Sequence, residues 1–421
     1  MEPLCNIWKN IGFISTRFAG TDGVSLETEK WAEVLGKKCF NCFYFAGELD
    51  RPEEKSMLVE EAHFMHPDIQ KLTSECFGKT KRKPSVTDKI LKLKDHLKSK
   101  IYKFVKKYDI DILVLENALA IPVNIPLGLA ITEFISETGM PAIAHHHDFF
   151  WERKRFLVNC VWDYLNMAFP PHLPSIKHVT INSTADNQIS FRTGVSSVVI
   201  PNVMDFANPP KIESDRNEVR KALGVQDGET LILQPTRVIQ RKGIEHAIEL
   251  VSKLDRKAKL VISHASGDEG PMYEKRVAQY SKMLNVRTKF VSKIISDERG
   301  VTEDGRKIYR IEDVYPHVDL VTYPSTFEGF GNAFLEAIYF KKPIVVNQYS
   351  IYAIDIKPKG FKTIEIDDFV SDTTVRKTKE ILDNPELAAS MTEHNYRLGN
   401  TYYSYNVLEK KLDAIIVSFA F

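Results

Sequence analysis

The sequence predicts two consecutive α/β domains, each built around a mostly parallel, doubly wound β-sheet with helices on both faces. The chain has 421 residues, which is too long for one compact domain and suits two domains of about 200 residues. Short apolar runs rich in β-branched residues alternate with amphipathic helical patterns. This alternation starts afresh after Pro201, so we expect one sheet on either side of that point.

The N-terminal half begins with an expected strand at Ile11–Ser15 and an expected helix at Val24–Leu35, whose apolar side chains recur on one face. Nearly continuous apolar runs of strand length then follow, as buried parallel strands require. They lie at Cys39–Phe45, Asp109–Leu115, Ala142–Ala144, His178–Asn182 and Ser197–Ile200.

The C-terminal half repeats the pattern after a segment, Asn202–Asp215, that contains two consecutive prolines and that we interpret as a linker. Its expected strands are Leu231–Gln234, Ala258–Ser263, Thr288–Val291, Leu320–Tyr323 and Pro343–Val346. Ligands of open parallel sheets bind at the carboxyl ends of the strands. The loops that follow these strands are therefore where we look for chemistry.

Composition excludes several classes of protein. The 57 basic and 56 acidic residues give a net charge of +1, so the chain has no bulk field that would attract nucleic acid. The five cysteines are odd in number and scattered, which favours a reducing cytoplasm over a disulfide framework. Residues 1–9 do not resemble a signal peptide, and the apolar stretch Ile112–Ile131 contains Glu116, two asparagines and two prolines. We therefore expect a cytoplasmic protein without a transmembrane helix.

The strongest candidate site follows the expected strand Leu320–Tyr323. The sequence there reads Pro-Ser-Thr-Phe-Glu-Gly-Phe-Gly-Asn, and an apolar helix is expected from about position 331. Glycines allow a backbone to approach a ligand closely, and a helix N-terminus offers free amides and partial positive charge. This pattern predicts a diphosphate site at Gly329, Phe330, Gly331 and Asn332. Glu328 and Glu336 flank it and could accept hydrogen bonds from sugar hydroxyls.

A second candidate site follows the expected strand Leu231–Gln234. Arg237 and Lys242 are cations five residues apart in this loop, a pattern that suits a diphosphate leaving group. Arg241 lies beside Lys242 and remains an alternative to it.

The spacing Glu-x7-Glu after Pro-Ser, with Gly-Phe-Gly between, resembles the signature of the retaining GT-B glycosyltransferases of glycosyltransferase family 4. The resemblance implies the GT-B fold, with two Rossmann-like domains facing across a cleft. It assigns Glu328 to the donor sugar, Glu336 to the ribose hydroxyls, and Arg237 and Lys242 to the departing nucleotide. A nucleotide sugar is then the co-substrate, and neither a metal nor another cofactor is expected.

The resemblance also implies a domain organisation. Residues 1–200 would form the acceptor domain and residues 201–400 the donor domain, and a helix in 401–421 would return to the first domain. Gly23, in the loop after the first strand, matches the family's glycine turn at the donor phosphates. His147, after the fourth strand, matches a histidine that approaches the donor sugar. Three consecutive histidines also raise the question of metal binding, but adjacent residues seldom face one ion, so we expect none.

The acceptor is predicted from polar residues near the strand ends of the first half. Arg17, Asn117, Asn124 and Arg153 suggest a small polyhydroxy acceptor with an acidic group, although a neutral sugar remains an alternative. The runs at positions 20–27 and 145–151 are similar to those of bacterial transferases that mannosylate glucosylglycerate-type solutes. This similarity implies transfer of mannose or glucose from a GDP or UDP sugar.

The stretch Lys79–Lys107 is strongly basic, with apolar residues at helical spacing. We favour an amphipathic helix packed on its sheet over peripheral contact with an anionic membrane. Three other functions stay open: a membrane-surface transferase with a lipid-linked acceptor, a non-catalytic nucleotide-sugar-binding protein, and a nucleotide-sugar epimerase. The linkage and the oligomeric state are likewise left open.

Overall fold

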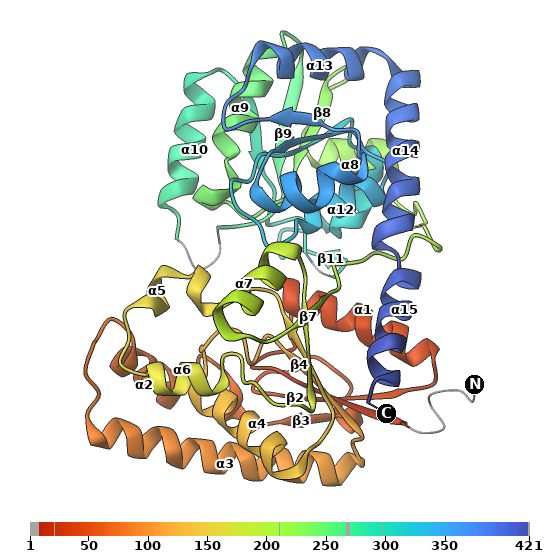
Figure 1. Ribbon diagram of the computed structural model, residues 1–421. Coiled ribbons are helices and arrows are strands. Elements are labelled where there is room, and N and C mark those ends of the chain that lie inside the picture. The colour runs from red at the N-terminus through yellow and green to blue at the C-terminus, as the bar shows by residue number, and fades with distance from the viewer. Residues whose placement is uncertain (1–7, 21, 210, 267–269, 297, 420–421) are drawn as a thin grey trace. The chain divides into compact units, whose positions relative to one another are not determined.

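A computed structural model describes residues 8–20, 22–209, 211–266, 270–296 and 298–419. The chain forms two compact units (Figure 1). Unit 1 comprises Met1–Asn202 and Tyr405–Phe421, and unit 2 comprises Val203–Ser404. Four positions that entered the sequence interpretation, Cys5, Thr21, Pro210 and Ala420, lie outside the described ranges.

Unit 1 contains a seven-stranded parallel sheet in the order β3-β2-β1-β4-β5-β6-β7. Its strands are β1 (Asn10–Ile14), β2 (Asn41–Ala46), β3 (Ser56–Leu58), β4 (Ile112–Glu116), β5 (Ala142–His146), β6 (Ile176–Thr180) and β7 (Ser197–Val199). Its helices are α1 (Gly23–Lys37), α2 (Pro67–Cys76), α3 (Pro84–Tyr108), α4 (Ile125–Thr138), α5 (Lys154–Leu157), α6 (Trp162–Ala168), α7 (Ser183–Thr193) and α15 (Tyr405–Val417).

Unit 2 contains a six-stranded parallel sheet in the order β10-β9-β8-β13-β14-β15. Its strands are β8 (Thr230–Gln234), β9 (Ala258–Ile262), β10 (Arg287–Phe290), β13 (Leu320–Tyr323), β14 (Ile344–Asn347) and β15 (Ile364–Ile366), besides a small hairpin of β11 (Gly300–Val301) and β12 (Lys307–Ile308). Its helices are α8 (Arg216–Ala222), α9 (Ile244–Lys253), α10 (Met272–Met283), α11 (Ile311–Val314), α12 (Asn332–Tyr339), α13 (Asp372–Asp383) and α14 (Pro385–Tyr403).

The two parallel sheets confirm the α/β class predicted from the sequence, and the reason lies in burial. All five residues of β4 are buried, because helices cover both faces of the sheet. Helix α4 is buried on most of its surface and packs against α3 and α6. The predicted strands deviate by at most three residues at their ends, and Leu320–Tyr323 matches β13 without deviation. The three-residue strands β3 and β15 were not predicted, whereas β7, which is equally short, was predicted from Ser197–Ile200.

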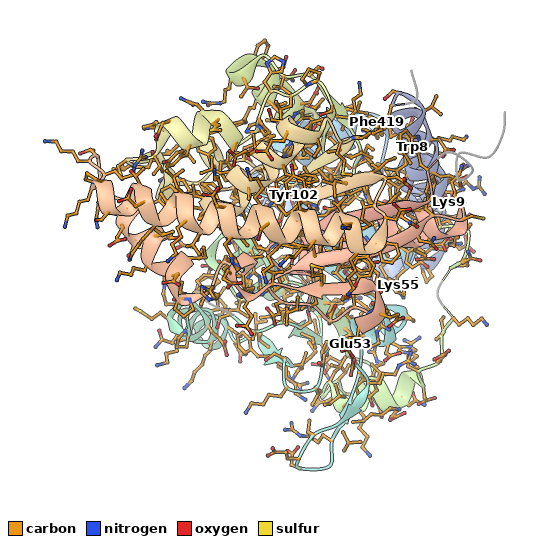
Figure 2. All side chains as sticks on the ribbon, turned by 90° about the horizontal axis from the view of Figure 1, so that it is seen from below. Trp8, Lys9, Glu53, Lys55, Tyr102 and Phe419 are labelled. Carbon is orange, nitrogen blue, oxygen red and sulfur yellow. The ribbon has the colours of Figure 1, made fainter. Side chains whose placement is uncertain are left out.

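The basic stretch forms the long helix α3, as expected for an amphipathic helix. Its apolar face, including Ile90, Leu97 and Phe104, is buried in unit 1. Figure 2 looks onto this helix, which runs along the outside of unit 1 and presents Tyr102. The Tyr102 hydroxyl donates to Glu137 of α4 at 2.7 Å, and Lys98 of α3 pairs with the same carboxylate. Part of the basic face is thus neutralised by α4. Among the described helices, none is long and apolar enough to cross a membrane.

The C-terminal helix α15 belongs to unit 1, although it directly follows α14 of unit 2. It packs beside α1 (Figure 1). Lys38, at the end of α1, pairs with Glu409 and Asp413 of α15. The chain therefore passes between the units twice, at Asn202–Val203 and again at Ser404–Tyr405.

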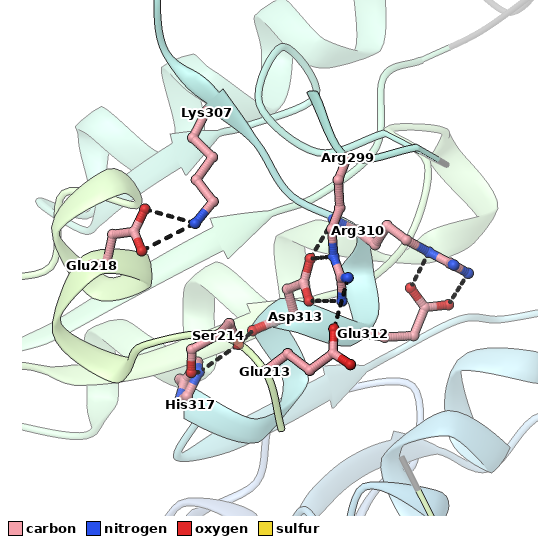
Figure 3. Close-up of polar contacts among 9 residues, drawn as sticks. All are labelled: Glu213, Ser214, Glu218, Arg299, Lys307, Arg310, Glu312, Asp313 and His317. Carbon is pink, nitrogen blue, oxygen red and sulfur yellow. Dashed lines mark hydrogen bonds and ion pairs between the residues drawn. The ribbon is translucent and has the colours of Figure 1, made fainter. Parts of the chain in front are cut away.

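The segment interpreted as a linker is largely part of unit 2. The passage between the units lies at its first residue, and its C-terminal end is bonded to the body of unit 2 (Figure 3). Arg299 pairs with Glu213 at 2.9 Å and with Asp313 at 2.7 Å. The Ser214 hydroxyl donates to the backbone carbonyl of Asp313 at 2.8 Å and lies 2.9 Å from the His317 imidazole. The passage between the units thus falls within the predicted linker Asn202–Asp215, and the C-terminal end of that segment belongs to unit 2.

Each sheet changes the direction of its strand order at one place. In unit 1 this switch point lies between β1 and β4, and in unit 2 between β8 and β13. The crevice at the carboxyl ends of the strands at a switch point is the usual ligand site of such sheets. The candidate residues can therefore be assessed at these two places.

Candidate functional site

The two motifs of the C-terminal half meet at the switch point of unit 2. Strands β8 and β13 are hydrogen-bonded neighbours, with Ile232 opposite Leu320. The loops that follow them are joined by a hydrogen bond from the backbone amide of Thr326 to the carbonyl of Arg241, at 2.8 Å. Positions that are more than eighty residues apart in the sequence thus form one cluster.

Glu328 lies at the centre of this cluster, and its side chain is buried. The Lys242 ammonium donates to one carboxylate oxygen, and the Arg241 guanidinium donates to the other at 3.0 Å. Burial raises the pKa of Glu328, but the charges of Lys242 and Arg241 outweigh this effect and hold the pKa below its usual value. Glu328 is therefore an anion held between two cations.

Lys242 is itself buried, and its ammonium lies over the Tyr323 ring at 5.5 Å from the centroid. Burial lowers the pKa of Lys242, and the charge of Glu328 opposes the shift only in part. Arg241 and Arg237 lower the pKa further, which shows that their charges act on the same place. The Arg237 side chain is exposed. The local excess of cationic groups over Glu328 makes this loop pair attractive to an anion.

Two glycines allow the loops to approach their neighbours. A Cβ on Gly243, at φ +58°, would lie 2.3 Å from the carbonyl oxygen of Pro324. A Cβ on Gly331, at φ +121°, would lie 2.3 Å from the Tyr349 hydroxyl oxygen. That hydroxyl donates to the carbonyl of Phe330 at 2.7 Å. Neither position has room for a side chain, so glycine is required for the backbone to approach Pro324 and Tyr349 this closely.

Helix α12 begins at Asn332 with Gly331 as its N-cap, and a glycine has no side chain to cap the first amides. Such a terminus carries partial positive charge and amide donors. Glu336 lies one turn into the helix, and its carboxylate accepts a hydrogen bond from the Tyr315 hydroxyl at 2.8 Å. Gly329 is between Glu328 and this terminus. The residues predicted from the sequence as a donor site are thus consecutive along one loop and helix start.

The histidines of unit 1 divide between the two faces of the sheet, because successive side chains of a strand point to opposite faces. His145 lies opposite Glu116 in the β4–β5 pair, and its ring stacks on Trp31 of α1 at 4.3 Å. His146 faces the other way and hydrogen-bonds His178 at 2.9 Å. His147 returns to the face of Glu116.

Glu116 is fully buried and lies between two imidazoles. One of its oxygens, Oε2, lies 3.0 Å from His145 Nδ1 and 3.4 Å from His147 Nε2. Burial raises the pKa of Glu116, but the two histidines outweigh it and hold the pKa at about 2. Burial lowers the pKa of His147, whereas Glu116 more than restores it, so the pKa is above its usual value. These three side chains offer ligand atoms that lie within 4.8 Å of one another, a group that could hold a metal ion.

Asn117 and Arg153, two of the predicted acceptor residues, lie beside His147. The Asn117 amide oxygen accepts from the backbone N–H of His147 at 3.0 Å, and its amide nitrogen donates to Asp148 at 3.0 Å. Arg153 pairs with the same Asp148 and is two-fifths exposed. Both residues shape the loop after β5, and their contact with an acceptor stays a prediction.

Asn124 is a correction to the sequence interpretation. Its side chain is buried and caps α4, accepting from the backbone N–H of Leu127 at 3.0 Å. Its amide nitrogen donates to the backbone carbonyls of Glu61 at 2.9 Å and of Ala62 at 3.0 Å. The polar groups of Asn124 are thus used within the fold, and we withdraw it as an acceptor ligand.

The glycine loop after β1 contains an internal anion. Asp22 caps α1, and its carboxylate accepts from the backbone amides of Val24 at 3.0 Å and Ser25 at 3.2 Å. Arg17 pairs with Asp22 at 3.0 Å. The amides that the sequence assigned to a bound phosphate are therefore occupied by a carboxylate, and a donor contact of Gly23 itself stays a prediction.

The sequence interpretation missed some partners of the predicted residues. It did not pair Glu116 with the histidines, nor Arg241 with Glu328, nor Tyr315 with Glu336. The position of Glu116 at the end of a strand adjacent to β5 was the available signal for the first pair. The other two depend on side chains from loops distant in the sequence, for which no local signal exists.

Sequence comparison places the chain among known transferases. The family profile described as "Glycosyl transferases group 1" matches residues 215–398. A mannosylglucosylglycerate synthase from Thermotoga maritima is 32% identical over 433 aligned positions, covering 95% of this chain and 97% of the relative. A mannosylglucosylglycerate synthase from Petrotoga mobilis is 29% identical, covering 85% of this chain and 86% of the relative.

Structural comparison agrees with the sequence comparison. A glycosyltransferase from Rickettsia africae has a TM-score of 0.68 at 16% identity, covering 97% of this chain and 98% of its own. The Anabaena protein HepE, solved in complex with UDP and glucose, has a TM-score of 0.65 at 14% identity, covering 97% of this chain and all of its own. These neighbours identify the GT-B fold. The chain therefore belongs to the group 1 family of glycosyltransferases.

Proposed function

We propose that this glycosyltransferase moves mannose or glucose from a GDP or UDP sugar to a small, acidic, polyhydroxy acceptor of the glucosylglycerate type, with retention of anomeric configuration. The observation that carries the proposal is the buried Lys242–Glu328 ion pair, with Arg241 on the same carboxylate, at the switch point of unit 2. In this assignment unit 2 binds the donor, and unit 1 contributes His147 and binds the acceptor.

The cationic groups of unit 2 suit the leaving group. As the bond between the anomeric carbon and the diphosphate breaks, its electron pair goes to the phosphate oxygen. Lys242, Arg237 and the backbone amides at the start of α12 would stabilise that charge, and they are arranged before the reaction begins. We therefore assign catalysis to these cations and expect no metal requirement in the transfer step.

The two carboxylates suit the rest of the donor. Glu328 is an anion beside the start of α12, where it can accept hydrogen bonds from hydroxyls of the transferred sugar. Glu336 lies one turn into the helix, where it can accept from the ribose hydroxyls. The acceptor hydroxyl oxygen would bond to the anomeric carbon on the face that the diphosphate leaves, and its proton would pass to the departing phosphate oxygen. This route produces retention without a covalent enzyme intermediate.

His147 and its loop are assigned to the reaction centre and the acceptor. Its backbone is held by Asn117 and its ring by Glu116, so the imidazole has a defined orientation. Arg17 and Arg153 are partly exposed cations on loops that follow β1 and β5, and they are the residues that we assign to an acidic group on the acceptor. The names of the two relatives support mannose as the sugar and glucosylglycerate as the acceptor class.

The first experiment is thermal unfolding of the purified chain with UDP, GDP or ADP, in the presence of EDTA. We expect one nucleotide to raise the melting temperature, because a ligand that binds only the folded state stabilises it. No shift with any of the three would contradict the donor assignment. The lysine variant described in the Discussion provides the control for binding at this site.

The second experiment measures the release of the nucleoside diphosphate from its mannose and glucose sugars, with and without glucosylglycerate. Release that requires the acceptor would support a transferase. Stable binding without release would instead support the non-catalytic nucleotide-sugar-binding protein, and conversion of the donor sugar without acceptor would support the epimerase. Analysis of the product anomer tests retention. Liposome binding of the chain through α3 would favour the membrane-surface alternative.

A further inference from the structure

The face of the unit 1 sheet that α1 covers contains three possible metal-ligand groups, of which the proposed transfer reaction uses His147 and the Glu116 carboxylate that orients it. Glu116 is the last residue of β4, and His145 lies opposite it on β5. His147 is two residues further on, so its side chain returns to the same face. The imidazole of His145 is backed by the indole of Trp31, which fixes its plane.

The three ligand atoms are spaced for one small ion. Glu116 Oε2 lies 3.0 Å from His145 Nδ1 and 3.4 Å from His147 Nε2, and all three atoms lie within 4.8 Å of one another. Zinc–nitrogen bonds are about 2.0–2.1 Å long, so the ligand atoms of a tetrahedral site are about 3.4 Å apart. Two of the three separations thus already match, and the third is at most 4.8 Å.

The carboxylate is also incompletely satisfied within the fold. Glu116 is fully buried, and in the described part of the chain its ion pairs are with the two histidines alone. Its second oxygen, Oε1, has no hydrogen-bond partner there. A buried carboxylate oxygen without a partner is costly, and a bound cation would compensate for it.

The chemistry of the donors selects the type of ion. Two imidazole nitrogens and one carboxylate oxygen are the ligand set of open zinc sites, in which a fourth position holds water or another ligand. Mg²⁺ and Ca²⁺ prefer oxygen-only sites. We propose that Glu116, His145 and His147 bind one divalent transition-metal ion of the zinc class.

Metal binding at this place has a consequence for the reaction, which rests on the proposed function. An ion bound to His147 Nε2 would remove that nitrogen from contact with a donor sugar. We therefore expect the ion to inhibit transfer reversibly rather than to assist it, and chelation to restore activity.

The test uses the full chain without a histidine tag, freed of metal with EDTA and dialysed. Titration with Co²⁺ should give one bound ion per chain and a visible absorption band typical of low coordination number, which Zn²⁺ should displace. Glu116→Gln and His147→Ala should each weaken binding by about tenfold or more. His172→Ala, which removes an exposed histidine of the same unit, is the matched control and should bind as the unchanged chain does.

Circular dichroism and thermal unfolding of each variant show whether it is folded. If Glu116→Gln does not fold, His147→Ala decides, because His147 lies in the loop after β5 and its side chain is one-tenth exposed, whereas Glu116 is wholly buried within β4. Absence of saturable Co²⁺ binding would overturn the proposal, as would binding that survives in both variants; the histidines would then serve only to neutralise Glu116. If the metal binds as expected but transfer continues at full rate, the site stands and the role proposed for His147 is wrong.

Discussion

Lys242 and Glu328 form a buried ion pair whose members have separate duties in the proposed reaction. Removal of a buried cation leaves its partner without compensation, but Arg241 also pairs with Glu328 and can retain it. Substitution of Lys242 therefore offers a test in which loss of activity can be distinguished from loss of the folded structure.

Lys242→Ala should lower kcat by about 100- to 1,000-fold, which is the usual effect of removing one preorganised group that stabilises developing charge. It should also abolish the thermal shift produced by the nucleotide. The control is Lys342→Ala, since Lys342 is a partly buried lysine of unit 2 that donates to the carbonyl of Pro316 at 2.7 Å rather than to Glu328. A Lys242→Ala enzyme with ordinary turnover would contradict the assignment of the leaving-group site.

Asn124→Ala should destabilise unit 1 by about 2–3 kcal/mol and leave the KM for the acceptor unchanged. The change removes a helix cap, worth about 1 kcal/mol, and leaves two backbone carbonyls without their donor, at about 1 kcal/mol each. Asn384→Ala is the matched control, because it removes only the cap of α14 and should cost about 1 kcal/mol. Urea denaturation measures both, and an altered KM with unchanged stability would restore Asn124 as an acceptor ligand.

At the scale of single residues, the sequence predicted those candidate site residues that follow a recognisable local spacing. Glu328 and Glu336 lie eight positions apart around two glycines, and such a pattern is visible without a structure. The role of Glu116 was not predictable in this way, because it depends on the register between β4 and β5. For the same reason the sequence interpretation compared adjacent histidines and overlooked that His145 and His147 share one face.

Neighbouring strands β5 and β6 are linked on their other face by a pair of buried histidines. Burial lowers the pKa of His178 to about 4, and His146, which hydrogen-bonds it, is also shifted downward by burial. The folded state therefore keeps both rings neutral at a pH at which the unfolded chain protonates them.

The stability that His178 contributes should be complete above about pH 6.5 and should decline as the pH falls toward 4. A shift of this size corresponds to about 3 kcal/mol at its full extent. Thermal unfolding between pH 7 and pH 4.5 measures the loss. His178→Gln, which cannot titrate, should show a smaller decline, part of which remains because of His146. An identical decline in the variant would show that other groups cause the acid sensitivity.

The central strands that the sequence predicted are buried on both faces, whereas the predicted edge strands β7 and β10 are partly exposed. β4 and β8 read as continuous apolar runs, and such runs identify central parallel strands directly. The sequence interpretation missed the three-residue edge strands β3 and β15, although it predicted β7, an edge strand of the same length. They form because the neighbouring strand offers hydrogen bonds, which is information that the local sequence does not contain.

Helix α15 belongs to a different unit from the helix that precedes it in the chain. It follows α14 of unit 2 directly, yet Leu408, Leu412 and Ile416 are buried within unit 1. Each such side chain contributes about 1.5–3 kcal/mol on burial. The stability of unit 1 therefore depends on residues synthesised after the whole of unit 2.

Deletion of residues 405–421 should destabilise unit 1 by several kcal/mol and leave unit 2 nearly unchanged. Hydrogen exchange followed by mass spectrometry distinguishes the two units, because peptides of β1 and α1 should lose protection while those of β8 and α9 should keep it. The nucleotide-induced thermal shift, which reports on unit 2, should survive the deletion. Loss of protection confined to unit 2 would contradict this view of α15.

The restart of the strand pattern after Pro201 was enough to predict two α/β sheets from the sequence, because each sheet imposes its own run of buried strands. The double passage of the chain could only be expected by analogy, since nothing in the composition of residues 405–417 says which surface they cover. The amphipathic pattern identifies a helix, and the partner of its apolar face is decided by the tertiary structure.

The first and last residues of unit 2 lie next to each other. Met204 and Ser404 form a β-bridge, and the amide of Met204 donates to the carbonyl of Tyr403 at 2.9 Å. Unit 2 is thus inserted into the sequence of unit 1, and its two ends lie side by side. The corresponding unit of another transferase could be grafted there by cutting the gene at two points. If unit 2 binds the donor as proposed, the hybrid should exchange the donor while retaining unit 1.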